Sequence, residues 1–139
     1  INIGDESPAA IQVQLLETAL LFNQTRQPLI GSSLAFGEAA MTRGPRFDPE
    51  AIRASNRNTF FVSDEYGPSI LEFDRRGNQI GAISIRDRYG ILKPSANPSE
   101  ELPPINTSGR FPNRGMECLA ISADGETLFA LMQGPLLQD

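Results

Sequence analysis

Four short runs rich in β-branched and aromatic residues, separated by tight turns, constrain the fold of this chain more than any other feature. Residues 51–54, 59–63, 69–74 and 79–85 each have the length and composition of a β-strand. The segments between them carry Asn, Gly and Pro, which favour turns. Four successive antiparallel strands with tight turns are what one blade of a β-propeller requires. The chain is therefore predicted to be all-β.

A second copy of this pattern follows. Residues 50–55 resemble residues 117–122, and each run continues through a polar turn, a threonine, an apolar strand and a Gly-Pro pair. The strands of the second copy are predicted at residues 118–122 and 127–132, on either side of a polar turn. We therefore expect about two blades, the first over residues 48–85 and the second from about residue 113.

Two blades cannot close a propeller, which needs four to eight. Residues 1–139 are therefore expected to be a fragment of one domain of about six or seven blades, completed by a second polypeptide or by further chain. Residues 86–112, with five prolines, are predicted to form a long exposed loop between the two units. The signals before residue 48 are weaker, with strand-like alternation at residues 11–15 and an irregular connection at residues 31–47.

The chain contains no histidine, and this absence narrows its chemistry. It excludes Ser-His-Asp triads, Cys-His dyads and histidine zinc sites within the chain. Any metal here would be held by oxygen, which favours calcium, with magnesium as the second choice. The single cysteine, Cys118, cannot form an internal disulfide, and its apolar neighbours predict a small buried core residue.

The charge and hydropathy of the chain exclude two classes of partner. A net charge of −5 disfavours nucleic acid as a general partner, because it too is negatively charged. An acidic protein can still bind phosphoesters if a divalent cation lies between them. No run of about 18 apolar residues is present, so no membrane span is expected.

Acidic residues flank several predicted strands and are the candidates for a metal site. Glu50 and Glu117 occupy the same position in the two repeats, so both should project toward the channel of a propeller. Converging carboxylates repel one another and need a cation or raised pKa values. Hard carboxylate oxygens suit calcium. The predicted metal ligands are Glu50, Asp64, Glu65, Glu117 and Asp139.

The alternative is that these acids cap turns, as Asp and Asn often do. We expect that role for Asp74 and Asp124, each of which lies in a short polar turn. It fits Glu50 and Glu117 less well, because glutamate is a poor turn residue. Each of these glutamates also lies beside an apolar strand, where burial without a partner would be costly. For the acids at residues 64–65 both interpretations stay open.

Two arginines and a tyrosine complete the candidate site. Arg114 and Arg43 are candidate anion binders, because a guanidinium matches phosphate or carboxylate geometry. A surface salt bridge is an equally good interpretation of Arg43. Tyr66 could pack against a ligand or cover the edge of a blade.

Taken together, these motifs resemble the phytase-like family, also described as esterase-like activity of phytase. Its members carry Asp-Pro-Glu-Gly-Ile, Ser-Asp-Glu-Tyr-Gly-Pro and Asn-Arg-Gly-Phe-Glu-Gly-Leu-Ala, in that order. Two family glycines are replaced here by the small residues Ala51 and Cys118, and the first 40 residues contribute little to the resemblance. The matching segments are residues 48–52, 63–68 and 113–120, followed by Pro135, Leu136 and Asp139.

The resemblance implies an exported β-propeller, secreted or periplasmic, that is often metal-dependent and linked to phosphoester hydrolysis. It favours a phytase-like or phosphatase-like hydrolase of a small phosphorylated or anionic substrate. Glu50, Glu65, Glu117 and Arg114 would then be catalytic, with Arg114 orienting the phosphate. One alternative is a non-catalytic propeller that calcium stabilises and that binds a ligand or protein partner. Another is a carboxylic-ester hydrolase, although the chain has no Gly-x-Ser-x-Gly motif.

Overall fold

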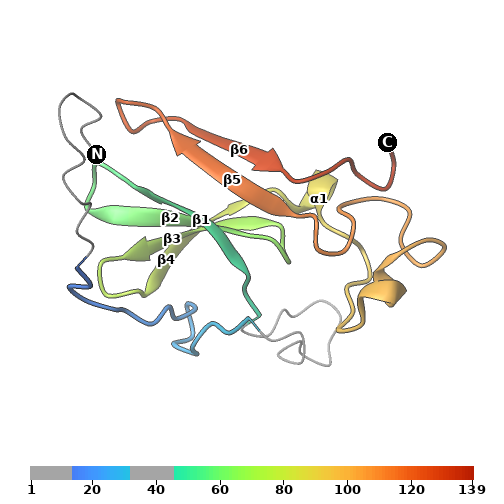
Figure 1. Ribbon diagram of the computed structural model, residues 1–139, viewed down its shortest axis with the longest axis horizontal. Helices are drawn as coiled ribbons and strands as arrows, with labels where there is room; N and C mark the ends of the chain where they lie inside the picture. The colour runs from blue at the N-terminus through green and yellow to red at the C-terminus, as the bar shows by residue number, and fades with distance from the viewer. Residues whose placement is uncertain (1–13, 32–45) are drawn as a thin grey trace, which may run out of the picture.

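The computed structural model describes residues 14–31 and 46–139 of the protein. Within these ranges the chain is all-β with almost no helix, and its strands form two antiparallel sheets (Figure 1). The first sheet has four strands in sequence order, and the second is a two-stranded hairpin. No helix in this part of the chain is long and apolar enough to cross a bilayer. The strands are β1 (Pro49–Ala54), β2 (Thr59–Asp64), β3 (Ser69–Asp74), β4 (Gln79–Ser84), β5 (Met116–Ile121) and β6 (Leu128–Met132).

All six predicted strands are confirmed to within two residues at each end. The turn between β3 and β4 shows how local sequence sets a hairpin. The amide of Gly77 donates to the carbonyl of Asp74 at 3.0 Å, and Gly77 has a positive φ of 84°. A Cβ at this position would lie 2.1 Å from the carbonyl oxygen of Leu20, so only glycine fits both the conformation and the space.

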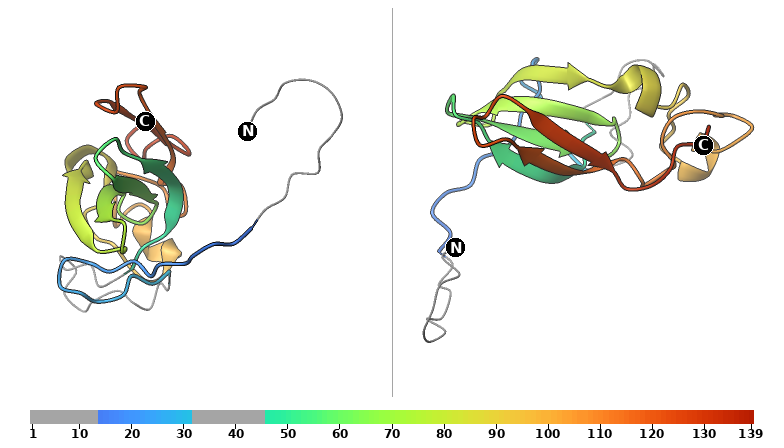
Figure 2. Two further views of the ribbon diagram at one scale, coloured as in Figure 1. Left: turned by 90° about the vertical axis from the view of Figure 1, so that its left-hand side faces the viewer. Right: turned by 90° about the horizontal axis from the view of Figure 1, so that it is seen from above.

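Apolar side chains on both faces of the first sheet are buried, and each face is covered by a different part of the chain. The β5–β6 hairpin lies along one side, where Phe61 packs with Met116 and Leu119 (Figures 1 and 2). Residues 14–31 lie on the opposite side, where Phe73 is fully buried. The ring of Phe73 stacks on Phe60, with centroids 5.5 Å apart. Burial of such a side chain contributes roughly 1.5–3 kcal/mol to stability.

Residues 14–31 are attached to the first sheet through Phe22. The amide of Phe22 donates to the carbonyl of Gly77 at 2.8 Å, and its carbonyl accepts from Gln79 at 2.9 Å. The predicted strand at residues 11–15 falls mostly outside the described residues, and Leu15 is exposed without regular structure. Most of the predicted irregular connection at residues 31–47 also lies outside them.

The segment of residues 86–112 contains two short helices, α1 (Arg86–Tyr89) and the 3-10 helix η2 (Pro98–Glu101). The prediction of an exposed loop was wrong in part, because Ile91, Glu101 and Arg110 are buried. The segment folds onto itself through an ion pair between residues nine positions apart, which hydrophobic periodicity does not reveal.

The prediction that Cys118 is a buried core residue was also wrong, because its side chain is exposed. A bulge between Met116 and Cys118 interrupts the pairing of β5 with β6. Met116 and Leu119 therefore face the core, while Cys118 lies opposite Leu131, which is 67% exposed. Bulges re-aim side chains in this way, and simple alternation along the strand cannot predict it.

Candidate metal centre

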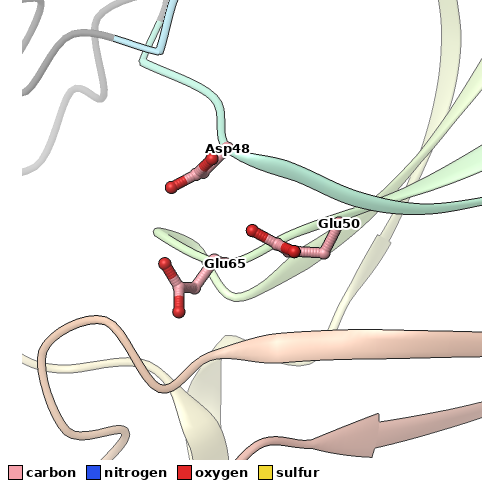
Figure 3. A group of neighbouring side chains, drawn as sticks. All are labelled: Asp48, Glu50 and Glu65. Atoms are coloured by element: carbon pink, nitrogen blue, oxygen red, sulfur yellow. The ribbon is translucent and has the colours of Figure 1, made fainter.

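Three carboxylates converge at one end of the first sheet. Asp48 lies directly before β1, Glu50 lies in β1, and Glu65 follows β2 (Figure 3). One carboxylate oxygen from each of them lies within 4.8 Å of the others. Glu65 is buried and Glu50 is exposed, so the group extends from the protein interior to its surface.

The pairing of β1 with β2 brings Asp48 and Glu65 together. Pro49 lies opposite Asp64 in the register of the two strands. The amide of Glu65 donates to the carbonyl of Asp48 at 3.0 Å. The amide of Asp48 donates to the Asp64 carboxylate at 3.1 Å. These two hydrogen bonds place the Asp48 and Glu65 side chains at the same end of the sheet.

Asp64 holds the turn that carries Glu65. Its buried carboxylate accepts hydrogen bonds from the amides of Tyr66 and Gly67 and from the hydroxyl of Ser69, in addition to that of Asp48. This is a capping arrangement, which satisfies backbone donors that would otherwise be buried without partners. Asp64 is not a member of the group of three, and its assignment as a metal ligand stays a prediction.

Asp48 is the member of the group that the sequence analysis did not name as a ligand. The sequence feature that could have identified Asp48 as a ligand is its place at the head of the Asp-Pro-Glu motif. It was missed because the repeat marked Glu50 and Glu117, whereas Asp48 is brought in by hydrogen bonds to Asp64 and Glu65.

Glu50 and Glu117 lie at equivalent interruptions of their strands. The register of β1 with β2 shifts between Pro49 and Ile52, and that of β5 with β6 shifts between Met116 and Cys118. Each glutamate lies within such a shift, and β5 packs next to β1. Glu117 acts electrostatically on Glu50 but is not a member of the group of three, so the expectation that both glutamates project toward a propeller channel stays a prediction.

Loss of water, together with mutual repulsion of the carboxylates, raises the pKa values of Glu50 and Glu65 above the ordinary 4.5 of glutamate. For Glu50, desolvation contributes most to the raised pKa, followed by repulsion from Glu117 and Asp48. For Glu65, burial raises the pKa most, and repulsion from Asp48, Glu50 and Glu117 adds to it. A hydrogen bond from the amide of Gly115 partly offsets the rise in the pKa of Glu65. The group therefore favours proton or cation binding.

Gly115 packs directly against Glu65. Its amide donates to Oε1 of Glu65 at 3.4 Å. A Cβ at residue 115 would lie 2.0 Å from the backbone carbonyl oxygen of Glu65, which leaves no room for a larger residue. The Asn-Arg-Gly motif therefore contributes its glycine to the site as a close backbone contact.

The structure places the other predicted site residues at the edge of this group or away from it. The exposed Arg114 lies beside Gly134, and its role as an anion binder stays a prediction. Asp139 accepts a hydrogen bond from the amide of Leu136 at 2.8 Å and is not part of the group of three. The predicted anion binder Arg43 lies outside the described residues.

Tyr66 packs within the protein. The guanidinium of Arg46 lies over its ring, 3.5 Å from the centroid. The Tyr66 hydroxyl donates to the carbonyl of Gly31 at 3.3 Å. The ring therefore connects the site to a neighbouring segment, which agrees better with a covering role than with ligand contact.

Asp74 and Asp124 are confirmed as turn caps. The amides of Arg76 and Asn78 donate to Asp74, and the side-chain amide of Asn78 lowers the pKa of this carboxyl most. Asp124 accepts from the hydroxyl of Ser122, which is the largest cause of its lowered pKa. Hydrogen bonds to the ionised carboxylates explain why the pKa values of both groups are lowered.

Comparisons with known proteins agree with the motifs. The chain is 29% identical over 173 aligned positions to a protein of Arthroderma benhamiae named "Uncharacterized secreted protein". The alignment covers 99% of this chain and 34% of that protein, so the chain spans about a third of its relative. No solved structure matches the chain.

A family described as "Phytase-like: Esterase-like activity of phytase" matches residues 4–139. The match extends the resemblance almost to the start of the chain, well before the first of the motifs at residues 48–52. Because it covers nearly all of the sequence, the chain belongs to the phytase-like family.

Proposed function

We propose that this protein is a metal-dependent phosphoester hydrolase, phytase-like or phosphatase-like, that binds calcium at Asp48, Glu50 and Glu65. The observation that carries the proposal is the convergence of these three carboxylates within 4.8 Å. Family membership supports phosphoester hydrolysis as the reaction class. The raised pKa values of Glu50 and Glu65 support a site that gains stability when a cation arrives.

The donor set fits a calcium ion. Oxygen ligands of Ca²⁺ lie at about 2.3–2.6 Å from the ion, so two ligands on one ion lie at most roughly 5 Å apart. The separation of the three carboxylates falls within this limit. Magnesium, with shorter bonds and a stricter octahedral geometry, is the less favoured ion.

Each residue of the site has a proposed task. Asp48, Glu50 and Glu65 hold the cation, and Glu117 adds negative charge beside them. Arg114, next to Gly115 in the chain, orients the anionic substrate through its guanidinium. A bound divalent cation would supply Lewis-acid chemistry, neutralising phosphoryl oxygens and acidifying a water molecule.

We also infer that the protein is secreted and that further chain completes a β-propeller around this site. The relative's name describes it as secreted, and it is longer than this chain. The outer face of β5–β6 leaves Phe129 59% exposed and Leu131 67% exposed, as expected for a face that another sheet covers. Beside β1, an open groove of about 430 Å³ is lined by Ile52, Phe60 and other mainly apolar residues. A native mass measurement that finds only a folded 15.2 kDa monomer would contradict the inferred completion.

The function is tested with metal-stripped protein to which calcium is returned. We expect calcium to restore release of inorganic phosphate from an aryl phosphate monoester, and Glu65→Gln to abolish it. The matched control is Glu126→Gln, which removes the same charge from an exposed turn. No phosphate release with any added cation would contradict the hydrolase proposal.

One specific observation favours a second candidate function. The three carboxylates come from the residue before β1, from β1 itself and from the turn after β2, so a cation would cross-link these elements. A calcium-stabilised, non-catalytic binding protein is therefore the alternative. Under it, calcium raises the melting temperature while no phosphomonoester is hydrolysed.

A further inference from the structure

A buried ion pair lies in the connection between the two sheets. Nη1 of Arg110 lies 2.8 Å from Oε2 of Glu101, and the two side chains are 2% and 3% exposed. The other oxygen of Glu101 accepts from the amide of Ser95 at 3.0 Å. Such pairs contribute little net stability, because the loss of water offsets the attraction of the charges. Net stabilisation therefore does not explain why this ion pair is buried.

The residues around this ion pair contact one another in a ring, and the ring includes Tyr66, the residue after Glu65. Nε of Arg110 donates to the carbonyl of Tyr66 at 3.1 Å. The ring of Tyr66 packs against the guanidinium of Arg46, whose Nη1 donates to the carbonyl of Ser95 at 3.1 Å. Ser95 in turn donates to Glu101, which pairs with Arg110. Each of these five residues therefore contacts two of the others.

The same segment reaches Glu65 from a second direction. Five residues after Arg110, the amide of Gly115 donates to Oε1 of Glu65. Gly115 lies so close to the Glu65 backbone that a Cβ at residue 115 would be 2.0 Å from the Glu65 carbonyl oxygen. Glu65 is therefore held through Tyr66 on one side and through Gly115 on the other.

We propose that the Glu101–Arg110 ion pair is a positioning element that sets the Glu65 carboxylate in the acidic group. Arg110 and Glu101 are positioning residues, since they act through Tyr66 and the backbone. The consequence for metal binding rests on the proposed function, while the consequence for the geometry at Glu65 does not. Burial of the pair makes this link rigid, because a misplaced charge would be left without a partner.

The test uses a double variant, Glu101→Leu with Arg110→Met, which removes both charges together. Apolar replacement of a buried pair is often tolerated, whereas removal of one partner leaves a buried unpaired charge. A second variant, Arg110→Lys, keeps a positive charge for Glu101 but lacks the guanidinium fork that also reaches Tyr66. The control is Arg57→Met, at an ion pair whose arginine is 69% exposed.

Two readouts separate positioning from general stability. The first is hydrogen exchange of the Gly115 amide by NMR without metal, compared with the Leu128 amide in β6. The second is affinity for Tb³⁺, a calcium mimic that is followed by luminescence excited through tyrosine. We expect the double variant to exchange at Gly115 about 10-fold faster and to bind Tb³⁺ about 10-fold more weakly. Leu128 exchange should stay unchanged, and Arg110→Lys should show the same pattern more weakly.

Unchanged exchange at Gly115, or equal acceleration at Gly115 and Leu128, would overturn the proposal. If the double variant does not fold, the same comparison in Arg110→Lys decides. If the wild-type protein fails to bind Tb³⁺, the proposed metal site is wrong, and exchange at Gly115 still decides whether the pair positions Glu65. Wild-type Tb³⁺ affinity in the double variant with accelerated Gly115 exchange would overturn the consequence for metal binding.

Discussion

Glu50 and Glu117 occupy equivalent bulges, one at the start of each sheet, and repulsion from Glu117 adds to the desolvation that raises the pKa of Glu50. A bulge lets a strand aim a side chain out of its normal alternation. The repeated unit therefore places one glutamate per copy in the neighbouring strands β1 and β5, and Glu50 also belongs to the acidic group. Asp48 and Glu65, which join Glu50 there, come from the first copy alone.

Substitution of the metal ligands should weaken cation binding in a graded way. We expect Glu50→Gln to lower calcium affinity about 10-fold or more, because it removes both a ligand and a charge. Glu117→Gln should have a smaller effect, since Glu117 acts by charge and is not one of the three converging ligands. Isothermal titration measures both. Equal affinity for calcium in wild type, Glu50→Gln and Glu126→Gln would contradict this assignment.

The stability of the metal-free protein should depend on pH through the same acids. The folded pKa values of Glu50 and Glu65 are raised above 4.5, so the folded state retains protons that the unfolded state has lost. Their contribution to stability is present below pH 4.5 and is lost as pH rises through the raised values. Calcium should reverse this trend by neutralising the carboxylates.

Thermal unfolding between about pH 4 and about pH 7, with chelator or with calcium, measures this effect. The double variant Glu50→Gln with Glu65→Gln serves as the reference, because it lacks both groups and retains the other acids. The lowered pKa values of Asp74 and Asp124 act in a separate window below 3.8. A metal-free wild type that gains stability with pH relative to this variant would refute the raised pKa values.

Gly115→Ala should damage both the fold and the site. The added Cβ would lie 2.0 Å from the Glu65 carbonyl oxygen, so the backbone must move. We expect a loss of about 1–3 kcal/mol in the free energy of unfolding, with weaker calcium binding. Gly31→Ala is the matched control, since its Cβ would lie at an ordinary 3.7 Å from the carbonyl of Phe47. Equal stability of the two variants in urea would contradict the close packing.

Phe73→Ala should separate the stability of the fold from the chemistry of the site. Phe73 is fully buried between Phe60 and Phe47 and is not a member of the acidic group. We expect a loss of about 3–5 kcal/mol, with little change in calcium affinity while the protein stays folded. Phe129→Ala, at an exposed position of this chain, should cost no more than about 0.5 kcal/mol. Chemical denaturation of both variants checks the contrast.

The strands and turns of this protein follow from its sequence because their causes are local. Residues 59–62 are β-branched or aromatic, and Gly77 adopts the conformation that its hairpin needs. Asp74 and Asp124 cap turns formed by their own neighbours. The repeat also predicted that Glu50 and Glu117 occupy equivalent positions, and each lies at a shift in the register of its strand pair.

Tertiary contacts decided the rest. The sequence predicts Asp64 and not Asp48 as a metal ligand, but in the fold backbone and hydroxyl donors surround the Asp64 carboxylate, whereas Asp48 lies in the acidic group. The bulge in β5 turns Cys118 outward, against the apolar run around it. Glu101 and Arg110 lie in a proline-rich segment without hydrophobic periodicity, and both are buried in the fold, where they form an ion pair. These outcomes depend on which side chains contact one another in the folded chain, and the residue pattern of a short segment does not specify those contacts.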